Sequence, residues 1–234
     1  MKATVDEIRQ RFDTDVERFS DLNVAQATAI DSALCLDLIA DGVAALTPNA
    51  TAVLDVGCGA GNWTIKLLGK LPALSCTLLD LSRPMLDRAR ERVTAAGAKH
   101  VDCVQADVRQ AAFADDSFDA IVTGAALHHL RDDAEWDSVF AAFHRWLRPG
   151  GGVWVYDMVT HESPAVHAAQ WQRYGDYLRQ LGGQAMADKV FAYIDAEDTP
   201  RPLAWQLDRL RAAGFRAVDV LHKNGPFAAY MAAK

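Results

Sequence analysis

The stretch VLDVGCGAGNWT, residues Val53 to Thr64, decides the fold of this chain. An apolar run ends in the carboxylate of Asp55, and the glycines Gly57, Gly59 and Gly61 follow it closely. A short apolar run that meets a glycine-rich turn and then an amphipathic segment is typical of a buried strand handing over to a helix. In open α/β sheets, ligands bind at such carboxyl ends of strands. The stretch therefore predicts both an α/β fold and the position of its ligand site.

The same pattern of strand, turn and helix repeats downstream. Further strands are expected at residues 75–80, 100–107, 118–125 and 152–159, and helices at residues 62–71, 82–97 and 133–147. Such alternation indicates βαβ units and a parallel sheet covered by helices on both faces. After a helix at 203–215, two strands around the turn KNGP (223–226) predict an antiparallel hairpin at the sheet edge.

Helical segments are expected on both sides of this repeat. Apolar residues recur every three or four positions from Val5 to Phe19, and a second helix is predicted over 27–46. Residues 160–201 break the strand–helix rhythm, are rich in aromatic side chains and predict two inserted helices. We interpret residues 1–234 as one domain with N-terminal helices at about 4–46 and an inserted helical lid at about 160–201.

Composition narrows the function classes. The formal net charge of −7 argues against nucleic acid as the main partner, which leaves a small molecule as the favoured one. The sequence contains neither an apolar run of about 20 residues nor a signal core, so we expect no membrane span and no export. The four cysteines form no CxxC pair, which favours the reducing cytoplasm, and no metal site is expected. A homodimer stays open as an oligomeric state.

Carboxylates at three strand ends indicate the type of ligand. A dinucleotide loop, G-x-G-x-x-G, would need glycine at position 62, which is Asn62. Asp55 in the loop would repel a pyrophosphate and attract a cation such as a sulfonium compound. Asp80 ends the second strand, where a carboxylate can accept hydrogen bonds from ribose hydroxyls. Asp107 ends the third, where it could accept a hydrogen bond from an adenine amino group.

Four stretches together resemble the class I S-adenosylmethionine-dependent methyltransferases. They are VLDVGCGAGNWT, LLDLSRPMLDRAR, VQADVRQAAFADDSFDAIVTGAALHHL and FHRWLRPGGGVWVYD, in the order of that family. The resemblance implies a Rossmann-like α/β fold, a seven-stranded mixed sheet flanked by helices with the last strand antiparallel. It also implies S-adenosylmethionine as cofactor. The cofactor-binding residues that it implies are Asp55, Gly57, Cys58, Gly59, Asp80, Leu81, Met85, Asp107, Val108, Thr123, Gly124 and Ala125. Phe12 and Phe19 of the expected N-terminal cover are further candidates, because an aromatic face attracts a sulfonium.

The acceptor is expected to be a small molecule. The stretch TGAALHHL (123–130) stands where nucleic-acid amine methylases often carry an Asn/Asp-Pro-Pro-Tyr motif. His128, Tyr156 and Asp157 are the candidate catalytic residues, with His128 as a proton acceptor, although positioning alone can supply much of the rate of methyl transfer. Candidate acceptor-binding residues are His128, His129, Trp171 and Tyr174. Each histidine could instead cap or pack beneath a helix, and the aromatic stripe could be ordinary core.

Three other functions remain open from the sequence. The chain could use the same cofactor without methyl transfer, by cyclising its aminobutyryl chain or modifying its methyl group. It could also be a non-catalytic module that binds the cofactor. An NAD-dependent dehydrogenase is disfavoured by Asn62 and Asp55.

Overall fold

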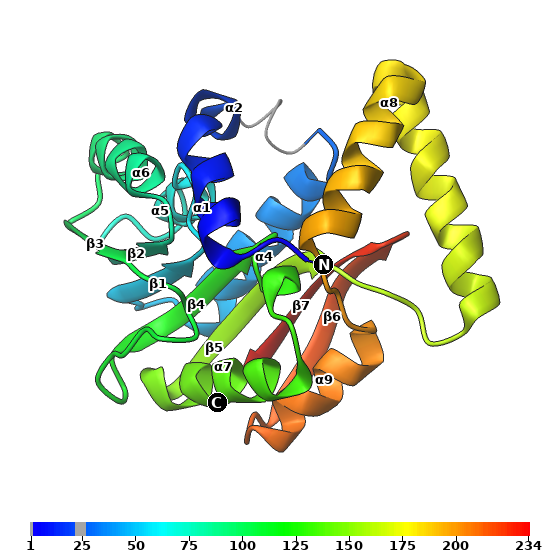
Figure 1. Ribbon diagram of the computed structural model, residues 1–234. Helices are drawn as coiled ribbons and strands as arrows, with labels where there is room; N and C mark the ends of the chain where they lie inside the picture. The colour runs from blue at the N-terminus through cyan, green and yellow to red at the C-terminus, as the bar shows by residue number, and fades with distance from the viewer. Residues whose placement is uncertain (1, 22–26) are drawn as a thin grey trace.

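The computed structural model describes residues 2–21 and 27–234, and a seven-stranded sheet runs through its middle (Figure 1). The strand order is β3-β2-β1-β4-β5-β7-β6, and β7 runs antiparallel to both of its neighbours. The strands are β1 (Ala52–Val56), β2 (Ser75–Asp80), β3 (His100–Gln105), β4 (Phe118–Gly124), β5 (Leu147–Met158), β6 (Ala217–Asn224) and β7 (Phe227–Ala233). This confirms the expected mixed sheet with a reversed last strand.

The strand order reverses direction around β1, which lies between β2 and β4. Val56 is level with Leu79 of β2 and with Thr123 of β4, so these three parallel strands end at the same edge of the sheet. Chain order runs outward from β1 on both sides, and ligands of doubly wound sheets bind at this switch point. The glycine loop that follows β1 therefore opens into the crevice between the two halves.

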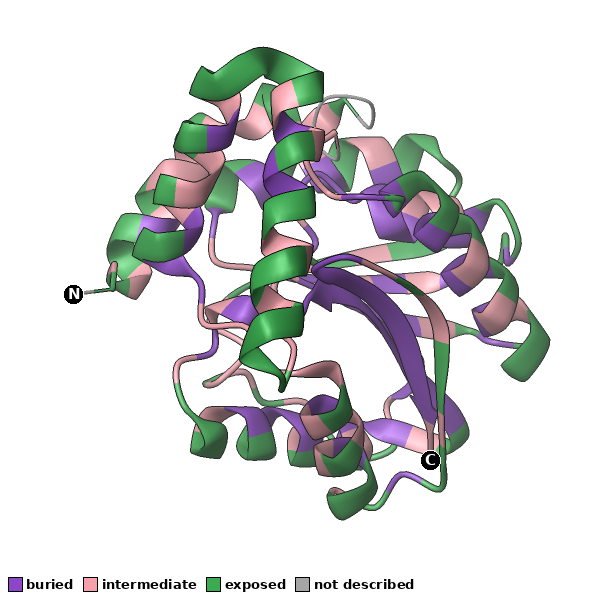
Figure 2. Cartoon of the chain, turned by 90° about the vertical axis from the view of Figure 1, so that its right-hand side faces the viewer, coloured by how far each residue is buried: buried purple, intermediate pink, exposed green. Residues whose placement is uncertain are grey.

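Each face of the sheet carries its own core. Val53 packs with helices α4 (Ser32–Leu46), α5 (Asn62–Leu68) and α6 (Arg83–Ala95) on one face. Leu54, the next residue, packs with α7 (Asp133–Trp146) and α9 (Leu203–Ala212) on the other face. Successive side chains of a strand point to opposite faces, so β1 is apolar throughout because both faces are covered. Figure 2 shows the sheet buried between helices whose outer surfaces are exposed.

Two short helices lie above the carboxyl edge of the sheet. Helix α1 (Val5–Thr14) begins with a capping box, in which Thr4 Oγ1 accepts from Glu7 N and the Glu7 carboxylate accepts from Thr4 N. Helix α2 (Val16–Ser20) follows directly, and both helices contact α6. Figure 1 shows them crossing above β1 and β4.

The insertion between β5 and α9 is α8 (Pro164–Glu197), which is broken into two arms. The break lies at Gly182 and Gly183, and Gly183 has φ of 76°, a left-handed conformation that a side chain would strain. The two arms fold back on one another as a helical hairpin (Figure 1). Two inserted helices were expected here, and the glycine pair explains where one ends and the other begins.

Two element boundaries differ from the sequence prediction by five residues, and the others differ by less. Helix α4 begins at Ser32, after Asp31 in a left-handed conformation, and not at Ala27; part of the segment before it, residues 22–26, lies outside the described residues. Strand β5 begins at Leu147, so the stretch RPGGG lies within it. The pairing of β4 with β5 shifts register between Phe118 and Ala120, which accommodates this proline- and glycine-rich stretch as an irregularity.

The two edge strands of the sheet are β3 and β6. The pairing of β6 with β7 shifts register between Val220 and His222, so β6 carries a bulge. Among the helices of the described residues, none has the length and apolar character needed to cross a membrane.

Candidate functional site

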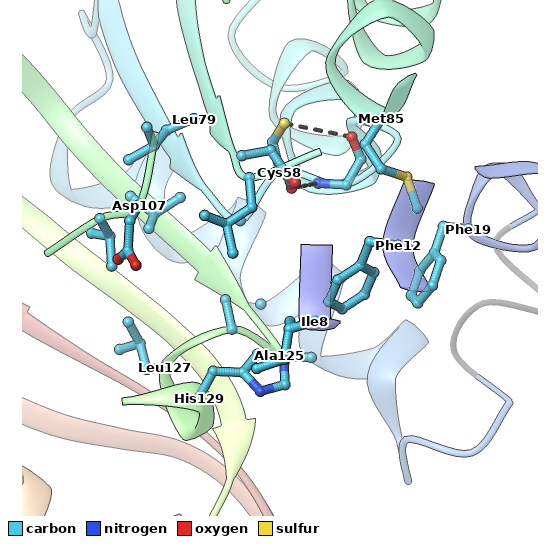
Figure 3. Close-up of a pocket in the computed structure, with 18 of the residues that line it drawn as sticks. Ile8, Phe12, Phe19, Cys58, Leu79, Met85, Asp107, Ala125, Leu127 and His129 are labelled. Carbon is cyan, nitrogen blue, oxygen red and sulfur yellow. Dashed lines mark hydrogen bonds between the residues drawn. The ribbon is translucent and has the colours of Figure 1, made fainter. Parts of the chain in front are cut away.

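A cavity opens at the carboxyl ends of β1, β2 and β4, beneath α1 and α2 (Figure 3). Its empty space, about 1290 Å³, includes open solvent at the mouth. Its floor comes from the loops after four strands, and its roof from Val5, Ile8, Phe12 and Phe19. The N-terminal part of the expected cover therefore does close over the site.

The glycine loop brings the backbone close to the cavity. Gly57 has φ of 65°, and a Cβ added to it would lie 2.6 Å from the Cβ of Ala126, so only glycine fits. Its amide and that of Cys58 donate to Leu79 O at 2.8 and 3.1 Å, which ties the loop to β2. Gly59 has φ of 49°, and a Cβ there would meet no atom within 4 Å, because it would point into open space. Gly57, Cys58 and Gly59 all line the cavity.

Asp55 lies behind the cavity wall and not at its surface, which corrects the expectation that it meets a cationic ligand. Its side chain is fully buried, and Oδ2 accepts from Thr64 Oγ1 at 2.7 Å and from Thr64 N at 3.3 Å. The carboxyl therefore holds the first turn of α5 against the end of β1. Burial raises the pKa of Asp55 to about 7. Thr123 is similarly buried, behind Gly124 and Ala125, which do line the cavity.

Asp80 reaches the cavity as expected from its place at the end of β2. Its Oδ2 accepts from Gly59 N at 2.8 Å and its Oδ1 from Ser82 N at 2.9 Å, so the carboxyl is fixed between two loops. Burial raises its pKa. Ser82 then caps α6 by accepting from Met85 N, and this sets Leu81 and Met85 into the cavity wall.

Asp107 and Val108, after β3, also line the cavity. Asp107 is paired with Arg109, whose Nε lies 2.9 Å from Oδ1, and Arg109 also reaches Glu135 at 2.8 Å. Burial alone would raise the pKa of Asp107, but hydrogen bonds from Arg109 outweigh it and lower the pKa. Arg109 was not among the predicted site residues, although its place two positions after Asp107 is visible in the sequence.

His128 points away from the cavity, which corrects its assignment as a proton acceptor for the substrate. The residue is 6% exposed, and its Nδ1 contacts Asp157 Oδ1. Asp157 is fully buried behind it and accepts from Leu127 N at 2.7 Å and His128 N at 3.2 Å. Burial alone would lower the pKa of His128, but the charges of Asp157 and Asp198 raise it to about 9. These two expected catalytic residues fix the turn after β4 from behind.

His129 is the histidine that lines the cavity, with Phe12 edge-on to its ring at 6.1 Å. Its Nδ1 lies 3.3 Å from Asp198 Oδ1, at the end of α8. Burial, and then the charge of His128, lower its pKa. Nothing in the sequence pattern pointed to Asp198, because the contact joins distant parts of the chain.

Tyr156 forms part of the cavity wall, with its hydroxyl turned away from the space. The hydroxyl donates to Ile30 O at 2.7 Å, and the ring stacks on Phe227 at 5.8 Å. Burial raises its pKa far above the ordinary value. Tyr156 therefore shapes the wall, and its expected proton-transfer role is not matched by its geometry.

Trp171 and Tyr174 belong to the core beneath α8, which corrects their assignment to the acceptor pocket. Tyr174 is 1% exposed, its hydroxyl donates to Thr28 O at 2.9 Å, and its ring meets Phe227 at 5.5 Å. Trp171 packs against the same cluster. The apolar stripe of the insertion covers the sheet, and the cavity is lined by other segments.

Known methyltransferases are similar to this chain in sequence. Residues 53–151 match a family model described as a methyltransferase domain. The chain is 31% identical over 188 residues to a demethylmenaquinone methyltransferase of Lactiplantibacillus plantarum, covering 78% of each protein. It is also 31% identical over 155 residues to phosphoethanolamine N-methyltransferase 1 of Arabidopsis thaliana, covering 62% of this chain and 30% of that protein.

Solved structures show the same fold at lower identity. A 1,6-didemethyltoxoflavin-N1-methyltransferase of Burkholderia thailandensis, solved with S-adenosylhomocysteine bound, superposes with a TM-score of 0.66 at 18% identity. The match covers all of this chain and 92% of the other. Human N-acetylserotonin methyltransferase superposes with a TM-score of 0.60 at 18% identity, covering 97% of this chain and 56% of the other.

Proposed function

Because this chain belongs to the class I S-adenosylmethionine-dependent methyltransferases and methylates a small molecule, we propose that its acceptor is a flat, mostly apolar ring, of the phenol or hydroquinone type. The observation that carries this proposal is the composition of the cavity wall away from the glycine loop. Val5, Ile8 and Phe12 form it from above, and Leu127 and Leu130 from below. Apolar walls with few polar groups select apolar ligands.

The charged residues of the wall support the same acceptor class. Arg109 is paired with Asp107 and Glu135. Arg131 donates to the carbonyls of Ala3 and Glu197. Among the described lining residues, these two arginines are the cations, and both are engaged. A phosphorylated amine, the acceptor named for the Arabidopsis relative, would need a free cation for its phosphate. A ring like that of demethylmenaquinone needs none.

The residues along the floor are proposed to hold the cofactor. The fixed carboxyl of Asp80 would accept hydrogen bonds from ribose hydroxyls, and Leu81, Met85 and Val108 would flank the adenine, with Asp107 at its edge. The backbone of Gly57 to Gly59 would pass close to the methionine part, with Gly124 and Ala125 beneath it. S-adenosylmethionine supplies a methyl group already activated by its sulfonium.

The remaining task of the chain is to orient the acceptor and exclude water. Aligned reactants can gain a large part of the rate from positioning alone. His129 Nε2 makes no hydrogen bond to any described residue, so we propose that it bonds the polar group of the acceptor and sets its direction. Phe12 and Phe19 would close the roof over the reacting atoms.

The test is an acceptor panel with product analysis by mass. The purified chain is incubated with S-adenosylmethionine and a short-chain demethylmenaquinol, a simple phenol or phosphoethanolamine. We expect a methylated ring compound and S-adenosylhomocysteine. Methylation of phosphoethanolamine alone would contradict the ring proposal. Methylthioadenosine without a methylated acceptor would point to other chemistry on the cofactor, and unchanged cofactor throughout would point to a binding module.

Three sequence-based expectations stay predictions. A cytoplasmic location is supported by the four cysteines, which are all free thiols. Exclusion of nucleic acid as a partner rests on the net charge of −7. A homodimer is a hypothesis that size-exclusion chromatography with light scattering would test directly.

A further inference from the structure

Beside the cavity, two histidines and a carboxylate converge on one point. His128 and His129 come from the 3-10 turn η1 (Leu127–His129), and Asp198 caps the end of α8. One side-chain ligand atom from each residue lies within 4.8 Å of the other two. We propose that these three residues form a binding site for a divalent transition metal of the zinc type.

Two of the three pairs of ligand atoms have the spacing expected around a tetrahedral ion, and the third pair lies within 4.8 Å. Metal–ligand distances of about 2.0–2.2 Å place two ligands of a tetrahedral zinc about 3.3–3.6 Å apart. Asp198 Oδ1 lies 3.3 Å from His129 Nδ1 and 3.6 Å from His128 Nε2. Direct hydrogen bonds between such atoms are usually shorter, about 2.7–3.2 Å. These gaps match a shared ion better than a hydrogen-bonded pair.

The unsatisfied atoms point to the same conclusion. Asp198 is 2% exposed, yet neither carboxylate oxygen makes a hydrogen bond to any residue in the described ranges 2–21 and 27–234. His129 Nδ1 lies 3.3 Å from Asp198 Oδ1 and likewise makes no hydrogen bond within those ranges. The contacts of this buried carboxylate with the two histidines, at 3.3 and 3.6 Å, are ion contacts without a hydrogen bond, and buried polar atoms in native structures usually have a hydrogen-bond partner or a ligand. A metal ion satisfies all of them at once.

Asp157 prepares His128 as a ligand. Its Oδ1 contacts His128 Nδ1, which places a ring proton on that nitrogen and turns Nε2 toward Asp198, where a bound ion would replace the second proton of the imidazolium. Metal-binding histidines almost always donate their other ring N–H to a carboxylate or carbonyl in this way. The backbone amides of Leu127 and His128 hold the Asp157 carboxylate in place.

The local charge suits a dication. Asp157 and Asp198 bring two buried carboxylates to two histidines that are neutral when they act as ligands. The guanidinium of Arg11, whose charge lowers the pKa of Asp198, is paired with Glu197 at 2.9 Å, so its charge is largely offset. Lys2 Nζ donates to the backbone carbonyl of Asp198 and not to its carboxylate. A divalent ion would neutralise the two carboxylates. It would also tie η1, and with it the His129 ring, to the end of α8 beside the acceptor.

The first experiment measures metal binding alone and does not depend on methyl transfer. Tag-free protein is stripped with a chelator, dialysed and titrated with zinc in competition with a chromogenic chelator. We expect one equivalent to bind, and cobalt to give the visible absorption of a tetrahedral site. A chain that takes up no stoichiometric zinc would overturn the proposal and leave the cluster as an ion-pair network.

Variants locate the site. His129→Ala and Asp198→Asn should each weaken zinc binding by more than the roughly 10–100-fold typical of losing an outer partner. His161→Ala is the matched control, because His161 and His167 form a second histidine pair, with ring centroids 6.0 Å apart. It should bind zinc as the parent does. Unchanged zinc affinity in both site variants, with circular dichroism reporting a folded chain, would contradict the assignment. Loss of zinc binding in His161→Ala alone would show that the metal binds at another site.

Discussion

The N-terminal helices and the α8 insertion share a pattern of aromatic residues but have different roles in the structure. Both carry aromatic residues at helical spacing, and both were expected to cover the ligand site. Phe12 and Phe19 line the cavity, whereas Tyr174 and Trp171 pack against the sheet. Helical periodicity reports that one face of a helix is buried. It does not report whether that face meets a permanent core or a space that a ligand fills.

The largest effect should follow from removing the N-terminal helices. Deleting residues 1–20 takes away the roof and should lower turnover by at least about 100-fold, because the reactants lose both their alignment and their shield from water. Cofactor retention should also fall. Circular dichroism and thermal melting check that the sheet still folds. A truncated chain with parental turnover would show that α1 and α2 are dispensable.

Removing one aromatic residue from the insertion should instead lower stability. Tyr174→Ala should cost about 3–5 kcal/mol of unfolding free energy, because it empties a fully packed position. Urea unfolding measures this loss. At a temperature where the variant is folded, its dissociation constant for S-adenosylhomocysteine should equal that of the parent. A higher dissociation constant with unchanged unfolding free energy would show that α8 contributes to the ligand site.

Asp80, in the floor of the cavity, should affect cofactor binding more than a single roof residue does. Asp80→Ala should weaken S-adenosylmethionine binding by roughly 10–100-fold, since each hydrogen bond to a charged group contributes about 1.5–3 kcal/mol. Calorimetric titration measures it, and Asp80→Asn is the size-matched control that should retain part of the affinity. Equal affinity in the parent, Asp80→Ala and Asp80→Asn would show that Asp80 only holds the two loops together and does not bind the cofactor.

Asp55 lies in neither of the two covering regions, and its buried carboxyl should make the unfolding free energy depend on pH. The unfolded carboxyl titrates near 3.9 and the folded one near 7, so the folded state binds more protons between these values. Stability from this group therefore falls as pH rises through that window. Asp55→Asn cannot ionise, and its unfolding free energy relative to the parent should improve by about 2 kcal/mol from pH 5 to pH 8. Urea unfolding at both pH values measures the change, and a constant difference would contradict it.

The smallest effect is expected for a single roof residue. Phe12→Ala should raise the dissociation constant for S-adenosylhomocysteine about tenfold and change unfolding free energy by less than about 1 kcal/mol, because the ring is only partly buried without a ligand. Hydrogen exchange with the same ligand should add protection in α1 and α2 and leave α8 unchanged. Protection rising in α8 would contradict the division of roles.

The sequence predicted the strands and helices well because apolar runs and their turns are local signals. It also predicted that Asp80 and Asp107 reach the cavity, since the ends of parallel strands share an edge. It was wrong about Asp55 and His128, because the direction of a side chain at a strand end depends on the turn that follows. Contacts between distant segments could not be predicted, because no local pattern reports them. An example is the contact of Arg11 with Glu197, 186 positions apart.

The bulge in β6 has a consequence for how molecules of this protein meet. An outermost strand offers unpaired backbone groups to any neighbouring chain, and a regular one invites aggregation. Here the irregularity between Val220 and His222 interrupts the ladder, and Asp219 and Lys223 add charges on either side of it. Such a rim is a poor template for another strand. If two copies associate, they should therefore not do so by pairing one β6 strand with another.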